Sequence, residues 1–140
     1  IGVTGASQGG FLSLAVAALD KRITFLGVVH DAMCDYSAEV HGVAGGWPHY
    51  FYKNTDKSLK VKVDASMYYD GVNFARRINV PGWYSFGYND EVVPPTSSYG
   101  LYNIVTAPKK LSVYQQTGHY WYQEQWDEWQ NYIKEHLNVK

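Results

Sequence analysis

Three residues of complementary chemistry, far apart in the chain, could together cleave an ester or amide bond. Ser7 lies in the stretch GASQG, directly after an apolar run and before a helical pattern. A G-x-S-x-G turn between a strand and a helix exposes the serine hydroxyl and strains its backbone. A serine hydroxyl becomes a nucleophile only when a base removes its proton, and an acid must orient that base. We therefore predict Ser7 as nucleophile, His119 as base and Asp90 as acid.

The neighbours of the predicted nucleophile also have predicted tasks. Gly5 and Gly9 would let the strand and the helix pass closely, because neither has a side chain. The backbone amide of Gln8 would point at an oxyanion formed on the substrate. The chain order of serine, then acid, then histidine is that of the α/β-hydrolases and differs from the two other common triad orders. This order is evidence independent of the serine motif.

The elements that must position these residues alternate between strands and helices. Strands are predicted over residues 1–4, 23–29, 81–88 and 111–115, and helices over residues 8–21, 66–77, 94–105 and 121–137. The predicted fold class is α/β: a partial α/β-hydrolase fold with a parallel sheet of about four strands flanked by helices. The nucleophile turn then lies near the N-terminus. Each predicted site residue follows a strand, where the catalytic groups of such sheets lie.

Two stretches carry apolar residues whose arrangement bears on the fold. Spacings of three and four residues predict the buried face of the first helix: Phe11, Leu12, Leu14, Ala15, Ala18 and Leu19. Residues 30–64 lack sustained periodicity, so we interpret them as a long excursion of the kind that often carries a lid. Its aromatic cluster could wall a substrate pocket or pin the excursion to the sheet: Trp47, Tyr50, Phe51 and Tyr52. Both interpretations stay open.

Other polar residues near the strand ends compete for a role. Glu91 is an alternative to Asp90 as the acid, and the sequence Asn-Asp at this point also favours a simple turn. His30 and Asp31 end the second strand, and we interpret them as loop-lining or hydrogen-bonded groups. We assign neither of them a catalytic role.

Composition limits the class of partner and cofactor. A formal net charge of −1, with 18% charged residues, predicts neither a nucleic-acid surface nor an acidic tail, so a small or neutral partner is expected. No apolar segment approaches the ~18 residues of a membrane span, so no membrane partner is predicted. The single cysteine, Cys34, is interpreted as a small buried residue. His41 and His49 lack further ligand spacing, so we predict no metal and no organic cofactor.

The ordered motifs resemble one known family. The chain is similar to the carboxyl-terminal half of the acetyl xylan esterase and cephalosporin-C deacetylase family in these blocks: GVTGASQGG, AMCDY, HGVAGGWPHYF, YYDGVNFARRINVP, GYNDEVVPPTSSYGLYN and TGHYW. The resemblance implies a serine esterase that removes acetyl or other short acyl groups from carbohydrate esters such as acetylated xylan. It gives Ser7, Asp90 and His119 the catalytic roles and the Gln8 amide an oxyanion role. Tyr120 departs from the family, which commonly has glutamate after the catalytic histidine.

The resemblance also sets an expectation for the extent of the domain. Residues 1–140 are expected to be the carboxyl-terminal portion of an α/β-hydrolase catalytic domain, whose second oxyanion donor lies upstream. An unpaired edge on the first strand would then favour a homo-oligomer. Periplasmic, secreted and cytoplasmic locations all stay open. Two alternatives also stay open: a serine peptidase of the prolyl oligopeptidase type, and a non-catalytic binding domain descended from a hydrolase.

Overall fold

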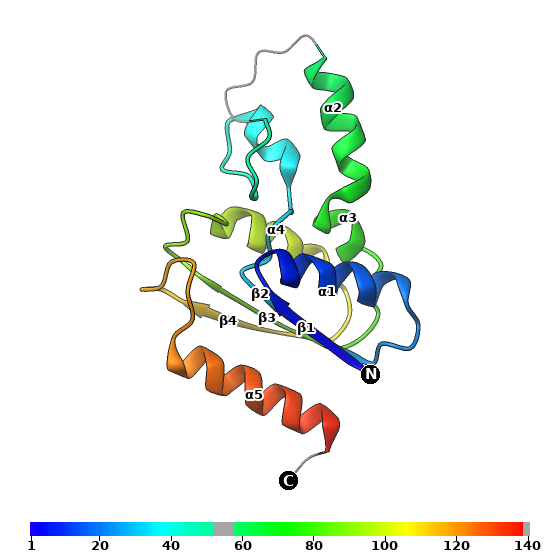
Figure 1. The fold of residues 1–140 in the computed structure, drawn as a ribbon, viewed down its shortest axis with the longest axis vertical. Coiled ribbons are helices and arrows are strands. Elements are labelled where there is room, and N and C mark those ends of the chain that lie inside the picture. The colour runs from blue at the N-terminus through cyan, green and yellow to red at the C-terminus, as the bar shows by residue number, and fades with distance from the viewer. Residues whose placement is uncertain (52–57, 139–140) are drawn as a thin grey trace.

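The computed structural model describes residues 1–51 and 58–138, and its centre is one parallel sheet (Figure 1). Its four strands lie in chain order: β1 (Gly2–Ala6), β2 (Phe25–Val29), β3 (Gly82–Gly87) and β4 (Lys109–Tyr114). Each adjacent pair of strands is parallel. Parallel strands bring their carboxyl ends to the same edge of the sheet, so the loops that follow them meet there. The predicted α/β fold class and four-stranded parallel sheet are confirmed.

Helices cover both faces of this sheet, because its central strands are apolar on both sides. Figure 1 shows α1 (Gln8–Leu19), α3 (Gly71–Ala75) and α4 (Pro95–Ile104) on one face and α5 (Gln123–Leu137) on the other. Alternate residues of β2 enter the two cores, as the two-residue period of a strand requires. Leu26 and Val28 pack toward α1, whereas Phe25 and Val29 pack toward Tyr132 of α5. No described helix has the length and apolar character needed to cross a membrane.

Helix α5 is held against the sheet by polar contacts as well as by apolar packing. Gln125 is fully buried and donates from Nε2 to Ser85 Oγ on β3 at 2.8 Å. Trp129 donates from Nε1 to Thr4 Oγ1 on β1 at 2.5 Å. The Gln125 amide nitrogen needs such a partner because it is buried, since an unpaired buried group costs about 1–3 kcal/mol. The contacts therefore fix the position of α5 and of the loop between β4 and α5, which contains His119.

The buried face of α1 differs from the predicted one. Phe11 and Leu14 are buried as expected, but Leu12 and Leu19 are 55% and 64% exposed. The helix spans 12 residues, and its buried side is centred on Gly10, Leu14 and Ala17. After Gln8, every position in this helix carries an apolar or small residue, so the spacing alone did not locate the side that faces the sheet. Leu12 and Leu19 are exposed because they lie on the opposite side of the helix.

The single helix predicted over residues 66–77 is wrong. The structure has α2 (Leu59–Ser66), a short 3₁₀ helix η2 (Met67–Tyr69) and then α3. Asp70 interrupts the run with an extended backbone, φ −77° and ψ 129°, and its carboxylate caps α3 by accepting the Val72 N–H. A residue that caps the next helix cannot continue the previous one, because an N-cap has non-helical dihedral angles.

The excursion after β2 forms an arm, which we define as residues 30–51 and 58–70. It contains a 3₁₀ helix, η1 (Tyr36–His41), and α2, and Figure 1 shows both standing beyond the sheet. Asp70 binds the two ends of the arm together, because its carboxylate also accepts the N–H groups of Asp35 and Tyr36 at 2.9 Å each. Thr96 of α4 donates to the Ala44 carbonyl at 2.6 Å. The arm is therefore attached to the sheet domain at defined points.

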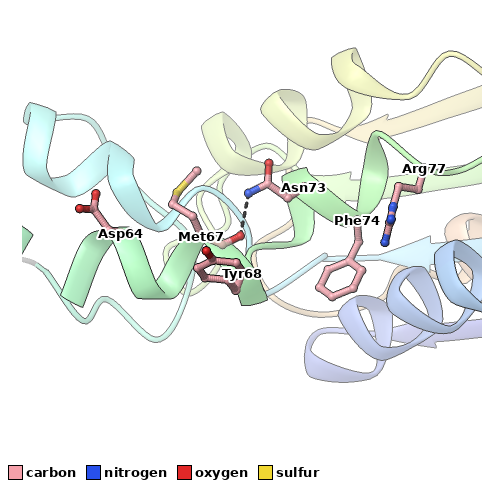
Figure 2. Close-up of a pocket in the computed structure, with 6 residues that line it drawn as sticks. All are labelled: Asp64, Met67, Tyr68, Asn73, Phe74 and Arg77. Carbon is pink, nitrogen blue, oxygen red and sulfur yellow. Dashed lines mark hydrogen bonds between the residues drawn. The ribbon is translucent and has the colours of Figure 1, made fainter. Parts of the chain in front are cut away.

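A pocket of about 440 Å³ lies along the arm, where α2 meets α3 (Figure 2). Six residues line it: Asp64, Met67, Tyr68, Asn73, Phe74 and Arg77. Asn73 donates from Nδ2 to the Met67 carbonyl at 2.7 Å, which joins η2 to α3 across the Asp70 break. None of these six is a predicted catalytic residue, so this pocket is formed by the arm together with residues 73–77 and not by the strand ends.

The three bonds to the Asp70 carboxylate give a stability prediction. Asp70 is 1% exposed, so Asp70→Ala leaves the N–H groups of Asp35, Tyr36 and Val72 without their acceptor. We expect the free energy of unfolding, measured by urea denaturation, to fall by about 2–4 kcal/mol. The matched control is Asp64→Ala, which removes only an exposed pair with Lys60 and should change it by less than about 0.5 kcal/mol. Equal losses in the two variants would contradict the role of Asp70.

Candidate active site

The predicted site residues meet at the carboxyl edge of the sheet. Ser7 directly follows β1, Asp90 lies three residues after β3, and His119 lies in the loop after β4. His119 Nε2 is 3.0 Å from Ser7 Oγ, and His119 Nδ1 is 2.7 Å from Asp90 Oδ2. Residues separated by up to 112 positions in the chain thus form one hydrogen-bonded series. The sequence order had suggested this series, and the structure brings its members within bonding distance.

The backbone of Ser7 adopts the strained turn that the motif predicts. Its φ is 56° and its ψ is −124°, a conformation that a non-glycine residue rarely adopts. The Ser7 N–H donates to the Val29 carbonyl of β2 at 2.8 Å, and the Ser7 carbonyl accepts the Phe11 N–H of α1. These bonds hold the residue between strand and helix. The hydroxyl is thereby presented at the end of β1 rather than inside the sheet.

The small residues around Ser7 act partly as predicted. A Cβ added at Gly5 would lie 2.3 Å from the Gly9 carbonyl oxygen, so only glycine allows the strand this close to the helix. The prediction for Gly9 is wrong, since a Cβ there would meet nothing within 4 Å. Gly10 takes that role instead, because a Cβ there would lie 3.1 Å from the Val29 carbonyl oxygen. The motif predicted the close approach but assigned one side of it to the wrong glycine.

The imidazole of His119 is oriented so that each ring nitrogen has a separate partner. Nδ1 donates its proton to the Asp90 carboxylate, which leaves Nε2 as the acceptor for the Ser7 hydroxyl. The side chain of His119 is 24% exposed, so a substrate and water can approach it. Glu91, the alternative acid, is exposed to solvent, whereas the Asp90 side chain is fully buried. The geometry therefore selects Asp90 as the acid partner of His119.

The carboxylate of Asp90 is buried yet fully supplied with donors. Oδ1 accepts the backbone N–H groups of Val92 and Val93 at 2.9 and 2.8 Å, and Oδ2 faces two histidines. Burial alone would raise the pKa of Asp90. The hydrogen bonds from His30, from the Val93 N–H and from His119 outweigh burial and lower the pKa to about 2. Asp90 is therefore an anion at every pH well above 2.

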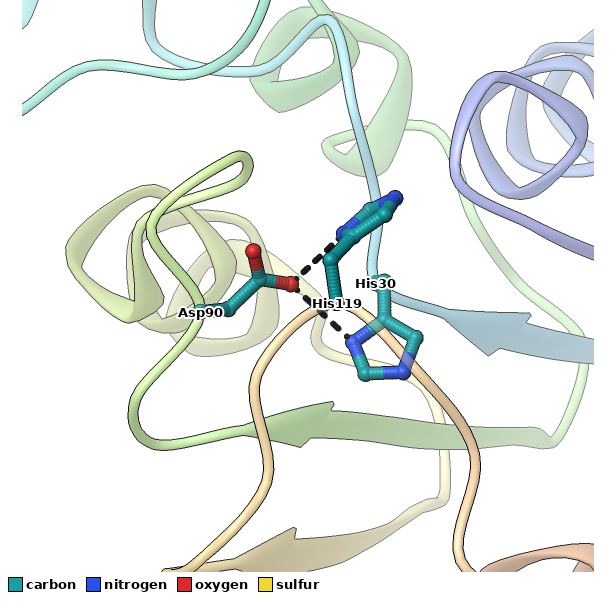
Figure 3. A group of neighbouring side chains, drawn as sticks. All are labelled: His30, Asp90 and His119. Atoms are coloured by element: carbon teal, nitrogen blue, oxygen red, sulfur yellow. Dashed lines mark hydrogen bonds and ion pairs between the residues drawn. The ribbon is translucent and has the colours of Figure 1, made fainter.

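The second histidine at this carboxylate is His30, at the end of β2 (Figure 3). Its Nδ1 is 3.2 Å from Asp90 Oδ2, and its side chain is 2% exposed. The interpretation of His30 as a hydrogen-bonded group is consistent with this contact. Its partner was not predicted, because nothing in the local sequence says which loop crosses the end of β2. One signal in the sequence could have indicated the contact. His30 directly follows a strand, and the other strands of the sheet are also followed by site residues.

These three side chains also form a potential ligand set. Within the part of the chain that the structure describes, His30, Asp90 and His119 are the one group whose ligand atoms could hold a metal ion, all within 4.8 Å of one another. Two of these ligand atoms are already linked, since His119 donates to Asp90. His49 was weighed above as a metal ligand. In the structure its Nδ1 lies 2.8 Å from Glu39 Oε1, and its Nε2 lies 3.1 Å from the Val92 carbonyl oxygen.

Two further titratable residues follow β2 and are buried. Burial raises the pKa of Asp31 to about 6, although hydrogen bonds to its carboxyl oppose the shift. Cys34 is fully buried, and burial raises the pKa of its thiol well above the usual value. A thiol in this environment stays protonated and unreactive. Cys34 is thus a packed core residue, as the sequence indicated.

A backbone donor stands beside the Ser7 hydroxyl. Gln8 is the first residue of α1, and the first N–H groups of a helix have no acceptor within the helix. Its side chain is exposed, so the segment borders solvent. The helix dipole adds partial positive charge at this end. An oxygen that becomes negative near Ser7 would therefore find a donor in the Gln8 amide.

A larger cavity of about 590 Å³ lies between the start of α1 and the arm. Aromatic rings dominate its lining: Phe11, Tyr36, Tyr50, Phe51 and Tyr69. Tyr50 is 61% exposed, whereas Phe51 is 5% exposed and donates its N–H to Glu39 Oε2. Tyr50 and Phe51 both wall the cavity, and Phe51 in addition anchors the arm. Trp47 is partly exposed, and Tyr52 lies outside the described residues.

The residue after His119 is the one visible departure from the resemblance. Tyr120 is 54% exposed, and its ring packs edge-to-face on Tyr122 with the centroids 5.9 Å apart. The triad contacts among Ser7, His119 and Asp90 form without it. Tyrosine in place of glutamate at position 120 therefore changes the exposed rim of the site and leaves the hydrogen bonds of the triad intact.

Comparison with known proteins agrees with this geometry. Residues 1–136 match the acetyl xylan esterase (AXE1) family. The chain is 47% identical over 108 residues to acetyl esterase Axe7A of Xylanibacter ruminicola, which covers 77% of this chain and 24% of that protein. Solved acetyl xylan esterases from Paenibacillus sp. R4 and Thermoanaerobacterium sp. JW/SL YS485 superpose with TM-scores of 0.81 and 0.80 at 26% and 28% identity.

The lengths of these relatives differ from that of this chain. The superpositions cover 93% and 96% of this chain but only 43% and 44% of the two solved chains. The chain therefore spans less than half the length of the relatives it matches. Because the family match covers nearly all of its residues and the fold agrees, this chain belongs to the acetyl xylan esterase family of α/β-hydrolases.

Proposed function

We propose that the protein is a serine esterase that removes acetyl or other short acyl groups from carbohydrate esters. The observation that carries the proposal is the hydrogen-bonded series from Ser7 Oγ through His119 to Asp90, with distances of 3.0 and 2.7 Å. Such a series lets a serine lose its proton as it attacks a carbonyl carbon. Membership in the acetyl xylan esterase family supports an ester substrate.

The reaction would proceed in two steps through an acyl-enzyme. Ser7 Oγ attacks the ester carbonyl while its proton passes to His119 Nε2, and the Gln8 N–H stabilises the oxyanion. The intermediate then expels the alcohol, which takes the proton from His119. Water attacks the acyl-serine, gives a proton to His119, and releases the carboxylic acid as Ser7 recovers its proton. Asp90 stays ionised throughout and holds the imidazole in the required tautomer.

The substrate side of the proposal rests on the family and on the aromatic cavity. Sugar rings pack well on aromatic side chains, and Tyr36, Tyr50 and Tyr69 line the cavity that borders the first turn of α1. The family match favours this function over a peptidase of the prolyl oligopeptidase type. A binding domain without activity is disfavoured by a complete triad, since a binding domain would not need all three residues in contact. Comparing turnover of acetyl esters and peptide amides separates these possibilities.

We also propose that residues 1–140 are the carboxyl-terminal portion of a longer catalytic domain. The solved relatives are more than twice as long as the matched region. Strand β1 is at the edge of the described sheet, and α1 exposes Leu12, Val16 and Leu19 on one side of the helix. Apolar surface of this kind is covered in most folded proteins. Preceding residues would cover it and supply the second oxyanion donor, which in this fold comes from an earlier loop.

The nucleophile can be identified by covalent labelling. A fluorophosphonate probe added to the full-length protein should label Ser7, because its hydroxyl is bonded to a histidine that can remove its proton. Ser7→Ala should abolish both the labelling and the hydrolysis of acetyl esters. Ser13→Ala, a matched change in the helix that follows Ser7, should be labelled at the unmodified rate because Ser13 Oγ donates to the Gly9 carbonyl and not to a histidine. Peptide mapping that finds the probe on another residue would refute the assignment.

The acid can be distinguished from its neighbour by paired variants. Asp90→Asn should lower kcat by ~10⁴, because an amide stabilises the wrong tautomer of His119 and cannot balance its charge. Glu91→Gln should retain at least half of the activity, because Glu91 is exposed. Initial rates with an acetyl ester measure both. If Glu91→Gln proved the more damaging change, Glu91 and not Asp90 would be the acid.

The extent of the domain gives a further prediction. Residues 1–140 expressed alone should hydrolyse acetyl esters with a kcat ~10²–10³ below that of the full-length protein, because they lack one oxyanion donor. They should also self-associate through the free edge of β1 as concentration rises, which light scattering measures. A monomeric fragment with full turnover would mean that residues 1–140 already contain the whole site and cover their own edge.

A further inference from the structure

We propose that His30 is a positioning residue of this site: its Nδ1–H donates to the carboxylate of Asp90 and shares its negative charge with His119. The inference rests on the proposed function, because it assigns His30 a task in the same hydrogen-bonded series. Its basis is that the His30 imidazole contacts the same carboxylate oxygen, Asp90 Oδ2, that orients the base His119. Asp90 Oδ2 lies 2.7 Å from His119 Nδ1 and 3.2 Å from His30 Nδ1. Figure 3 shows both rings directed at this atom from different strand ends.

The proton on His30 follows from the contact itself. A carboxylate oxygen only accepts, so we infer that the nitrogen 3.2 Å from it carries the hydrogen, because two lone pairs facing each other at that distance would repel. The contact is longer than that of His119 and less well aligned, so it is the weaker of the two. Both ring nitrogens are buried, and neither makes a hydrogen bond of full geometry among the described residues, so the 3.2 Å approach of Nδ1 to Asp90 is the polar contact on which the inference rests. The structure thus assigns His30 the Nδ1–H tautomer.

Burial shows that His30 acts through Asp90 and not on a substrate. Its side chain is 2% exposed, whereas that of His119 is 24% exposed. The His30 ring packs between the His119 ring, with centroids 5.1 Å apart, and the edge of Trp121 at 6.5 Å. His30 therefore touches the acid and the base from the side away from solvent. This position excludes water from the buried oxygen of Asp90.

The backbone at His30 is adapted to this position. Its φ is 47°, in the left-handed region, and its N–H donates to the Ser85 carbonyl at 2.9 Å. Asparagine tolerates this region better than most residues, and its amide nitrogen lies near the place of the histidine Nδ1. His30→Asn therefore keeps both the backbone and the donor. His30→Leu keeps the approximate volume and removes the donor.

The charge sharing has a defined effect on the pH dependence of the reaction. Without the His30 donor, the full charge of Asp90 acts on His119, which favours the protonated imidazole. A protonated base cannot accept the Ser7 proton, so the acid limb of the kcat/KM profile moves to higher pH. The other titratable groups near this cluster are Asp31, whose buried carboxyl has a raised pKa of about 6, and the exposed Glu91. The test must separate Asp31 from His30.

The experiment compares pH profiles of acetyl-ester hydrolysis by the full-length protein and its variants. We expect His30→Leu to move the acid limb upward by roughly half a pH unit and to lower kcat three- to tenfold with KM unchanged. His30→Asn should restore the original limb and most of kcat. The same shift should occur when His30→Leu is combined with Asp31→Asn. His41→Leu, at an exposed histidine, is the matched control and should change nothing.

Each outcome decides for or against the role of His30. An unmoved or lowered acid limb in His30→Leu, or an Asn variant that behaves like the Leu variant, would overturn the inference. If His30→Leu does not fold, long-range ¹⁵N–¹H spectra of histidine-labelled protein decide instead, with His30→Asn used for assignment. They should show the Nδ1–H tautomer at His30, and the Nε2–H tautomer would refute the proposal. Absence of ester hydrolysis and of Ser7 labelling in the unmodified protein would instead refute the proposed function, and the spectra would still test His30.

Discussion

The buried carboxylate of Asp90 is the group on which the rest of the site depends. An anion without solvent is strongly unfavourable unless polar groups surround it, and four such groups contact the Asp90 carboxylate. Two are backbone N–H groups of its own loop, and two are imidazoles from other strand ends, His30 and His119. The anion is therefore stable only when β2, β3 and β4 are in register. The geometry of the sheet and the ionisation of the acid support each other.

The sequence predicted what local chemistry determines. The strand, turn and helix around Ser7, the four parallel strands and the triad order all follow from short patterns, and each appears in the structure. The break at Asp70 was missed, because the decisive bonds of its carboxylate go to Asp35 and Tyr36, 35 and 34 residues away. Local spacing cannot reveal an acceptor that serves distant backbone groups.

The same limit explains the errors in the packing around α1. A helix made almost wholly of small and apolar residues gives no contrast between its sides, so Leu12 and Leu19 were placed on the wrong one. The role given to Gly9 instead of Gly10 came from the serine motif, which includes Gly9 and ends one residue before Gly10. Likewise, the contact between His30 and Asp90 joins the ends of β2 and β3, which the sequence shows only as two separate strand endings.

The arm links the proposed substrate cavity to the acid of the triad. His49 in the arm lies between Glu39, whose other oxygen accepts the Phe51 N–H, and the carbonyl of Val92. The Val92 N–H in turn donates to Asp90 Oδ1. His49, which binds the residue that holds Phe51 in the cavity wall, thus also contacts the loop whose N–H groups bind the Asp90 carboxylate. Because closely packed segments transmit displacements to one another, a shift of the arm would change the position of the loop that binds Asp90. The arm is therefore structurally coupled to the site.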